Sequence, residues 1–186
     1  MNCRNLILLS LPGLLTGIQC KKNIALPKNL PPITQEGKNT FGFKADGKIW
    51  TPFFTCPTYG NRCGELSCDI ANLPPSIKPL APMGMAASRK FADEDSRFSI
   101  DARQTIFIRL GSYIDSISVQ FRSNGQYSLG YPQPGDKFNI TKIDTINRII
   151  SGEFEFILKA SDGSGRTVKI TEGRFDFSYP FCKCSN

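Results

Sequence analysis

Carboxylates and cysteines are the residues of this chain that could carry chemistry, because it has sixteen Asp and Glu and seven Cys but no histidine. The absence of histidine excludes Ser-His and Cys-His nucleophile pairs, His-Glu-x-x-His zinc sites and histidine general bases. A carboxylate pair could still hydrolyse a glycosidic bond, and Glu153 and Glu155 lie two residues apart in an alternating segment. The alternation explains Glu153 and Glu155 better as ordinary charged residues on the solvent face of a strand than as a catalytic pair. We therefore expect a protein that is not an enzyme and has no cofactor, with a carboxylate-based hydrolase of envelope polysaccharide as the alternative.

The spacing of these residues does not favour a metal site either. The acidic turn Asp93–Asp95 lacks the alternating oxygen ligands and the distal Glu of a calcium loop. The cysteines beyond residue 50 do not form the two Cys-x-x-Cys knuckles of a zinc site. We expect no bound metal.

The apolar run "LILLSLPGLL", residues 6–15, follows a single cation, Arg4. It has the length of a signal-peptide core and is shorter than the roughly 20 residues that a membrane-spanning helix needs. "LLTGIQC" then resembles the cleavage box of bacterial lipoproteins, with Gln19 where a small residue is preferred. We expect residues 1–19 to be a signal peptide, Cys20 to be lipidated and residues 20–39 to be a proline-rich tether. Ordinary secretion and no processing are the alternatives.

Export favours disulfide bonds among the remaining cysteines. Adjacent-strand crowding disfavours a bridge between the last two, so we expect a link from the 56–68 region to the carboxyl-terminal tail, with the partners left open. Five thiols cannot all pair within one chain. The disulfide candidates are Cys56, Cys63, Cys68, Cys182 and Cys184.

Residues 40–186 read as one all-β domain. In "TFGFKADGKIW" the pair Asp46-Gly47 favours a type I′ hairpin, which places Phe43 opposite Trp50. In residues 149–179 the apolar residues alternate, so that a loop at 161–165 sets Leu158 opposite Val168. A second turn at Glu172-Gly173 would complete a three-strand meander.

The fold that these strands predict is an antiparallel β-sandwich, with an open or closed antiparallel β-barrel as the alternative. At most one short helix is expected, near "YIDSI" at 113–117. The chain carries a net charge of +7, but its cations are scattered, so we expect no nucleic-acid partner.

Between residues 51 and 88 the alternation breaks in a segment rich in Pro, Gly and Cys. Such a long irregular loop is either functional or a disulfide-pinned excursion that covers one end of the sheet. In the functional interpretation its large apolar side chains form a binding rim. The candidate rim residues are Phe53, Phe54, Tyr59, Met83 and Met85.

The opening segment "LPPITQEGKNTFGFKADGKIW", residues 30–50, resembles that of a family of uncharacterised Bacteroidota lipoproteins, and "IDTINRIISGEFEF" and "VKITEGRFDFSY" resemble its closing strands. The resemblance implies a lipid-anchored, β-rich domain of unknown function with no assigned catalytic residues. Many members have Cys where this chain has Phe43. In the same bacteria Asp-Ser/Thr-aliphatic tripeptides are O-glycosylated, which makes Ser116 and Thr145 candidate acceptors. Lysines rather than acids follow Cys20, which by resemblance favours the periplasmic side of the outer membrane.

Together these features predict an envelope lipoprotein that binds a small apolar or glycan ligand, or that takes part in an assembly with an envelope protein. Its partners are then the membrane, through the lipid anchor, and that ligand or protein.

The first prediction concerns processing. The protein extracted from its native membranes should have the mass of residues 20–186 plus lipid, less two hydrogen atoms for each disulfide, and Cys20→Ser should abolish the lipid. Intact-mass spectrometry with and without reductant checks this. An amino terminus at Met1 would contradict the predicted processing. A mass equal to the lipidated chain alone would exclude glycosylation at Ser116 and Thr145.

Overall fold

The computed structural model describes residues 26–53, 66–70, 83–91, 94–102, 111–112, 117–130 and 133–183. Within these ranges the regular structure is all β, with no helix. The strands are β1 Thr40–Ala45, β2 Lys48–Trp50, β3 Leu66–Ile70, β4 Met83–Phe91, β5 Glu94–Ala102, β6 Gly111–Ser112, β7 Ser118–Ser123, β8 Gln126–Gly130, β9 Lys137–Asp144, β10 Ile149–Ala160, β11 Thr167–Ser178 and β12 Phe181–Lys183.

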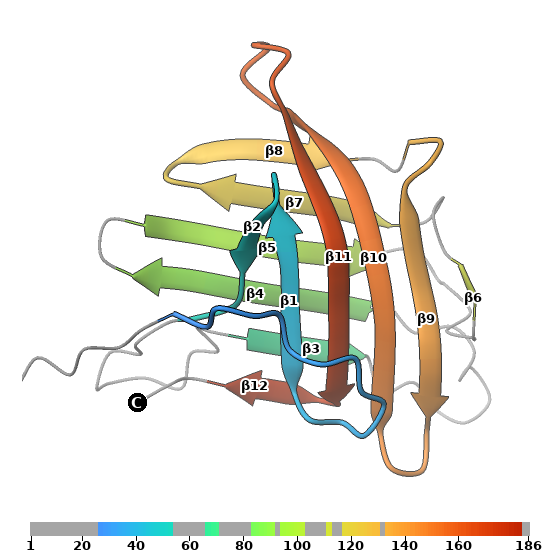
Figure 1. Ribbon diagram of the computed structural model, residues 1–186. Helices are drawn as coiled ribbons and strands as arrows, with labels where there is room; N and C mark the ends of the chain where they lie inside the picture. Colours follow the sequence, from blue (N-terminus) through green and yellow to red (C-terminus); the bar gives the residue numbers. More distant parts are fainter. Residues whose placement is uncertain are drawn as a thin grey trace, which may run out of the picture.

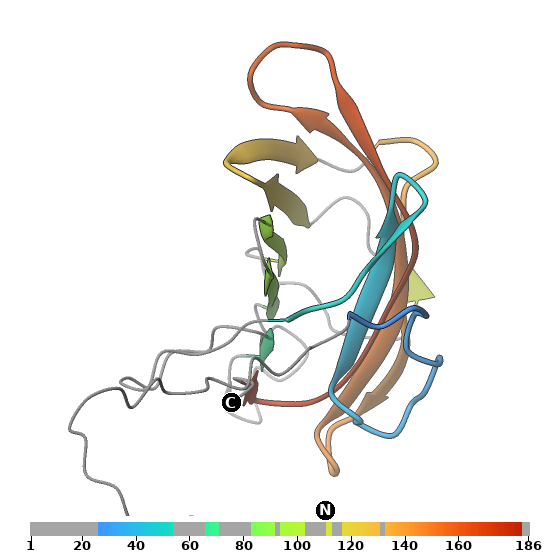
Figure 2. The ribbon, with the colours of Figure 1, turned by 60° about the vertical axis from the view of Figure 1, so that its left-hand side comes forward.

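Two antiparallel sheets pack together as a β-sandwich, as the alternating segments predict. The front sheet has the order β6-β9-β10-β11-β1-β2, and the back sheet has the order β12-β3-β4-β5-β7-β8. Figure 1 shows the strands of the front sheet crossing those of the back sheet, and Figure 2 shows the two layers from the side. In the described part of the chain no closed barrel is found, so the closed-barrel alternative is wrong.

The two sheets meet at β10, which is shared between them. Its first half, up to Glu155, pairs with β9, and its last two residues pair with β8. Between these stretches the N–H of Ile157 donates to the buried carboxylate of Asp136 at 2.9 Å, and the N–H of Gln133 donates to its other oxygen at 2.8 Å. Asp136 therefore satisfies a backbone donor at the point where β9 and β8 diverge.

The predicted β1–β2 hairpin is confirmed. Phe43 pairs with Trp50, and their rings stack with centroids 4.7 Å apart. Asp46 and Gly47 have φ values of 47° and 78°, the left-handed conformation that a type I′ turn needs at both central positions.

The predicted β10–β11 pairing is also confirmed, since Leu158 pairs with Val168. The predicted turn at Glu172-Gly173 is wrong, because β11 runs without interruption to Ser178. These two residues form a β-bulge instead, seen as a register shift against both neighbouring strands, β10 and β1. The third strand of the expected meander is therefore β1, which pairs with the far side of β11.

The core lies between the sheets and is dominated by phenylalanine. Phe43 and Phe154 from the front sheet meet Phe98 from the back sheet, with centroid distances of 4.8 and 5.3 Å. The inward-facing positions of both sheets supply the rest, as the two-residue period requires. The buried apolar residues are Phe41, Phe43, Trp50, Leu66, Cys68, Met83, Met85, Ala87, Phe98, Ile100, Ile117, Val119, Phe121, Phe138, Ile140, Ile150, Phe154, Phe156, Leu158, Ile170, Phe175 and Phe177.

The expected irregular loop at 51–88 needs correction, because Leu66–Ile70 is β3 and the segment from Met83 onward is β4. Met83 and Met85 do not form a rim: they are 3% and 2% exposed and lie in the core. The outward positions of "MGMAAS" are Gly, Ala and Ser rather than charged residues, so the segment lacks the apolar-polar alternation that indicates a strand.

Trp50 is joined to the back sheet by a polar chain. Its indole N–H donates to Ser96 at 2.8 Å, and the Ser96 hydroxyl donates to Glu94 at 3.0 Å. Glu94 in turn forms an ion pair with Arg89 at 2.8 Å, and Arg89 donates to the carbonyl of Ile49 at 3.1 Å. The chain of contacts therefore returns to β2 and fixes this edge strand over the back sheet.

The bulge generates the second prediction. A Cβ at Gly173 would lie 2.4 Å from the ring of Phe154 and 2.6 Å from its carbonyl oxygen, so Gly173→Ala should lower the free energy of unfolding by about 2 kcal/mol or more. The matched control is Gly84→Ala, whose Cβ would meet only one atom within 4 Å, at 3.6 Å. Urea unfolding of the three proteins measures the difference, and equal midpoints for the two variants would contradict the assignment.

Candidate functional site

An extended segment, Leu30–Lys38, crosses the outer face of the front sheet and is called the strap below. It runs over β1 and β11 to β10 before the chain turns back into β1 (Figure 1). Gly42 lets it approach, because a Cβ there would lie 2.9 Å from Pro31 Cδ and 3.2 Å from Leu30 Cδ2. Residues 26–39, which the sequence assigns to a tether, thus include a part that packs on the domain.

The strap is held by one buried carboxylate, that of Asp176 on the outer face of β11. Asp176 is 1% exposed and accepts five hydrogen bonds, of which four come from the strap and one from its cross-strand neighbour on β10. The donors are Thr34 Oγ1 at 2.6 Å, the amide nitrogens of Glu36, Gly37 and Lys38 at 3.1, 2.8 and 3.1 Å, and Ser151 Oγ at 2.8 Å.

These donors decide the charge of the group. Burial alone would raise the pKa of Asp176, but the hydrogen bonds from Thr34, Ser151 and the strap amides favour the carboxylate and lower its pKa to about 2. Asp176 is therefore ionised at neutral pH and acts as an acceptor only.

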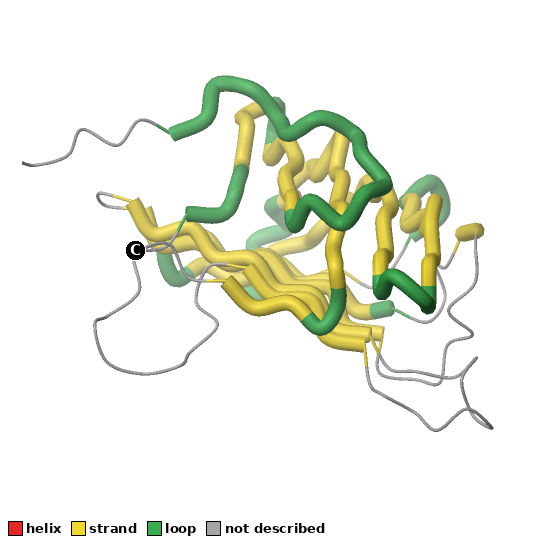
Figure 3. The backbone as a smooth tube through the Cα atoms, turned by 90° about the horizontal axis from the view of Figure 1, so that it is seen from below, coloured by secondary structure: helices red, strands yellow, loops and turns green. Residues whose placement is uncertain are grey.

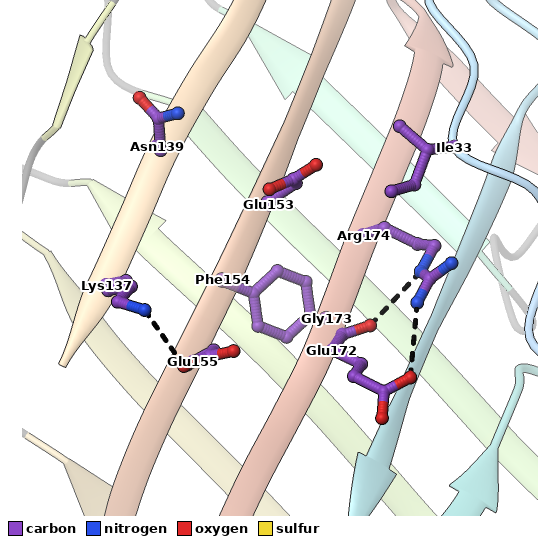
Figure 4. A pocket seen from close by; sticks show the side chains of 9 residues that line it. All are labelled: Ile33, Lys137, Asn139, Glu153, Phe154, Glu155, Glu172, Gly173 and Arg174. Carbon is purple, nitrogen blue, oxygen red and sulfur yellow. Dashed lines mark hydrogen bonds and ion pairs between the residues drawn. The ribbon is translucent and has the colours of Figure 1, made fainter.

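Beside the strap, the outer face of the front sheet contains a hollow of about 300 Å³. Strands β9, β10 and β11 form its floor, and Ile33 of the strap stands at its rim (Figure 4). Six of its nine lining residues are polar or charged, and the full set is Ile33, Lys137, Asn139, Glu153, Phe154, Glu155, Glu172, Gly173 and Arg174.

The register of the strands arranges these polar side chains in rows. Glu153 is the cross-strand partner of Asn139 on β9 and of Arg174 on β11. In the next row Glu155 is opposite Lys137, and their charged groups lie 3.4 Å apart. Side chains on a rigid sheet keep such spacing better than side chains on loops.

The charges of the hollow are nearly balanced. Glu172 accepts from Lys44 Nζ at 2.5 Å and lies 3.6 Å from Arg174, and the hydrogen bond from Lys44 is the main reason that the pKa of Glu172 is lowered. Arg174 also donates to the carbonyl of Pro31 in the strap at 3.4 Å. Glu153 is the exception, since it has neither ion pair nor hydrogen bond among the described residues, as Figure 4 illustrates.

The two acids that sequence spacing singled out, Glu153 and Glu155, thus lie in the same hollow. Sequence reasoning did not identify Asn139, Arg174 or Ile33 as their neighbours. Only the strand register and the path of the strap bring these residues together, and no local motif marks them.

The other predicted residues are distributed over the surface and the core. Thr145 lies in the exposed β9–β10 turn, where Asp144 accepts the N–H groups of Ile146 and Asn147 at 3.1 and 2.8 Å. Phe53 is half-buried and its backbone pairs with β4. The predicted sites that lie outside the described residues are Cys20, Phe54, Cys56, Tyr59, Cys63, Ser116 and Cys184.

The described cysteine positions lie on neighbouring strands. Cys68 is buried on β3, and β12, which contains Cys182, pairs with β3 so that Phe181 is opposite Cys68. The tail of the chain therefore lies beside the end of the Cys-rich region. Across the described residues no disulfide bond is formed, and the proposed bridges stay predictions.

The acids considered for calcium are engaged elsewhere. Glu94 pairs with Arg89, and Asp95 pairs with Arg122 at 3.2 Å, whereas Asp93 lies outside the described residues. In the described ranges, no three His, Cys, Asp or Glu side chains gather as a metal site.

Comparison with known proteins gives no relative: the chain matches no family model, no curated protein and no solved structure. The part of the chain that the structure describes contains no helix long and apolar enough to cross a bilayer.

The third prediction concerns pH. Because the pKa of Asp176 falls from 3.8 to about 2 on folding, its carboxylate should contribute roughly 2 kcal/mol of stability above pH 4, which is lost as the pH falls from 4 to 2. Asp176→Asn should be less stable at neutral pH and should lack this step. Urea unfolding between pH 2 and 6 measures both. As a control, Glu36→Gln, which removes an exposed carboxylate of the strap, should retain the step.

Proposed function

We propose that the protein is an exported envelope lipoprotein whose folded domain binds a glycan in the hollow of the front sheet, without catalysing a reaction. The observation that carries the binding role is the row of Asn139, Glu153 and Arg174 across three strands, beside a rim formed by Ile33. Amide, carboxylate and guanidinium groups at strand spacing suit a ligand with several hydroxyl groups, each of which can donate and accept.

Of the two ligand classes that the sequence left open, the polar one is supported better. Six of the nine lining residues have polar or charged side chains, and Phe154 is 1% exposed. An apolar ligand would desolvate the carboxylate of Glu153, which has no partner among the described residues, and burial of an unpaired charge is costly. Ile33, 59% exposed, supplies apolar contact at one side only.

A hydrolase remains the alternative, because Glu153, Glu155 and Glu172 line one hollow. Glycoside hydrolysis needs a carboxylic acid that stays protonated near neutral pH. Glu172 is held as a carboxylate by Lys44, and Glu155 is in an ion pair with Lys137. These pairings support a binding role over catalysis.

A part in an envelope assembly has less support. The exposed large apolar side chains of the described residues are Ile33, Ile146 and Ile157, and single exposed apolar residues are usual on monomers.

The remaining parts of the proposal come from the sequence. Lipidation at Cys20 would make the membrane a partner, and the lysines that follow Cys20 favour the periplasmic side of the outer membrane. Ser116 and Thr145 are proposed glycosylation acceptors. A disulfide from the 56–68 region to the tail is proposed because such a cross-link stabilises exported domains.

The fourth prediction tests the site. Among soluble oligosaccharides of glucose, galactose, glucosamine and N-acetylglucosamine, at least one should bind the protein, and Glu153→Gln or Asn139→Ala should weaken that binding by about tenfold. Isothermal titration calorimetry measures the affinity. Gln120→Ala, on the outer face of the back sheet, is the matched control and should bind normally.

Two results would change the proposal. If no oligosaccharide binds, the hollow is not a glycan site. If new reducing ends appear during incubation and Glu153→Gln abolishes them, the hydrolase alternative replaces the binding role.

A further inference from the structure

The rim of the hollow at Ile33 belongs to the strap, which is not part of either sheet. Ile33 lines the hollow. Together with its neighbours Pro32 and Thr34 it also encloses a narrower space beneath the strap, bounded on the sheet side by Gly152, Phe175 and Asp176. Figure 3 shows residues 26–39 as a loop that runs outside the strands. The hollow therefore has its observed shape only while the strap lies on the sheet.

Few contacts hold the strap, and most of them converge on Asp176. Four of its five hydrogen bonds come from Thr34 and the amides of residues 36–38. The other hydrogen bonds between the described strap and the sheet are the donations of Lys142 Nζ to Gln35 O at 2.8 Å and of Arg174 Nη1 to Pro31 O at 3.4 Å. Directly after the strap, the N–H and hydroxyl of Ser178 donate to Asn39 Oδ1 at 2.9 and 3.0 Å. Loss of the carboxylate would leave three adjacent amides without their acceptor, so the strap would leave the sheet as a unit.

We propose that Asp176 is a positioning residue of the glycan site: its carboxylate docks the strap, and the docked strap completes the hollow by placing Ile33 at the rim and bonding Arg174 through Pro31. Asp176 itself does not line the hollow. The role of the hollow in this inference rests on the proposed function, whereas the docking of the strap does not.

Docking and binding are then linked. A ligand that fits only the completed hollow binds the docked state, and its apparent affinity falls in proportion to the docked fraction. By reciprocity the same ligand increases docking. A variant whose strap is docked in one molecule of ten would bind about tenfold more weakly, although every residue on the floor of the hollow is unchanged.

Two variants release the strap from different ends without altering the lining of the hollow. Asp176→Asn removes the anionic acceptor at the residue 34–38 end. Gly42→Ala places a Cβ 2.9 Å from Pro31 Cδ at the other end. The control is Lys38→Gln, which breaks only the exposed Lys38–Glu36 ion pair of 3.0 Å within the strap.

The decisive measurement is amide hydrogen exchange by NMR on the full chain, with no ligand present. In Asp176→Asn the amides of residues 36–38 should lose about tenfold or more of their protection, while the amides of β10 and β11 keep theirs. Nuclear Overhauser contacts between Ile33 methyl groups and Arg174 should weaken in both Asp176→Asn and Gly42→Ala and persist in Lys38→Gln. Unchanged contacts in both release variants, or parallel loss of protection in the strands, would overturn the inference.

Oligosaccharide binding separates this inference from the proposed function. With the oligosaccharide that binds the wild-type protein best, both release variants should bind more weakly in proportion to their loss of docking. Normal binding by a variant with a released strap would refute the positioning role and leave the glycan site intact. If no oligosaccharide binds even the wild-type protein, the proposed function fails and so does the role of Asp176 in a glycan site, while hydrogen exchange still decides the docking.

Discussion

The carboxylate of Asp176 is the interaction on which the outer face of the front sheet depends. The strap pairs with no strand, so its amide groups need acceptors from elsewhere. The two oxygens of one buried carboxylate together accept from three consecutive amides and two hydroxyl groups, with Thr34, Glu36 and Lys38 donating to Oδ2, and Gly37 and Ser151 donating to Oδ1. Burial of that charge costs free energy, and the five hydrogen bonds offset the cost. Strap, β10 and β11 are thereby fixed relative to one another.

A second constraint, the bulge in β11, connects the core to the hollow. The side chains of Ile170, Phe175 and Phe177 all face inward. Ile170 and Phe175 are an odd number of positions apart, and in a regular strand such residues face opposite sides of the sheet. One extra residue at Glu172 restores the inward face. The same bulge leaves Gly173 beneath the ring of Phe154 and sends Glu172 and Arg174 outward. The packing of the core and the charges of the hollow therefore have one origin.

The sequence predicted what local patterns determine. The β1–β2 hairpin and the β10–β11 pairing follow from turn residues and alternation. The sequence predicts a turn at Glu172-Gly173, where the structure has a bulge. A turn and a bulge both accommodate Glu-Gly with a left-handed residue, and only the pairing of β11 with β1 decides between them. The first part of β4 was missed because its outward residues Gly84, Ala86 and Ser88 are small rather than charged.

The candidate site was predictable only in part, for the same reason. Glu153 and Glu155 are visible by spacing, yet their neighbours come from β9, from β11 and from a strap more than one hundred residues earlier. "LPPITQEGK" has the composition of a tether. Nothing within the segment reveals that the acceptor of its amide groups is Asp176.

In the proposed lipoprotein, the docked strap shortens the tether between Cys20 and the domain. With a lipid on Cys20, only residues 20–29 separate the anchor from the strap, and ten extended residues span at most about 35 Å. A tether of residues 20–39 would span about twice that distance. The docked strap would then keep the domain near the bilayer, and a pull along the tether would act first on the Leu30–Pro31 end of the strap and then on the Asp176 contacts. In such a protein the distance from the membrane and the completeness of the hollow would both depend on the four hydrogen bonds from the strap to Asp176.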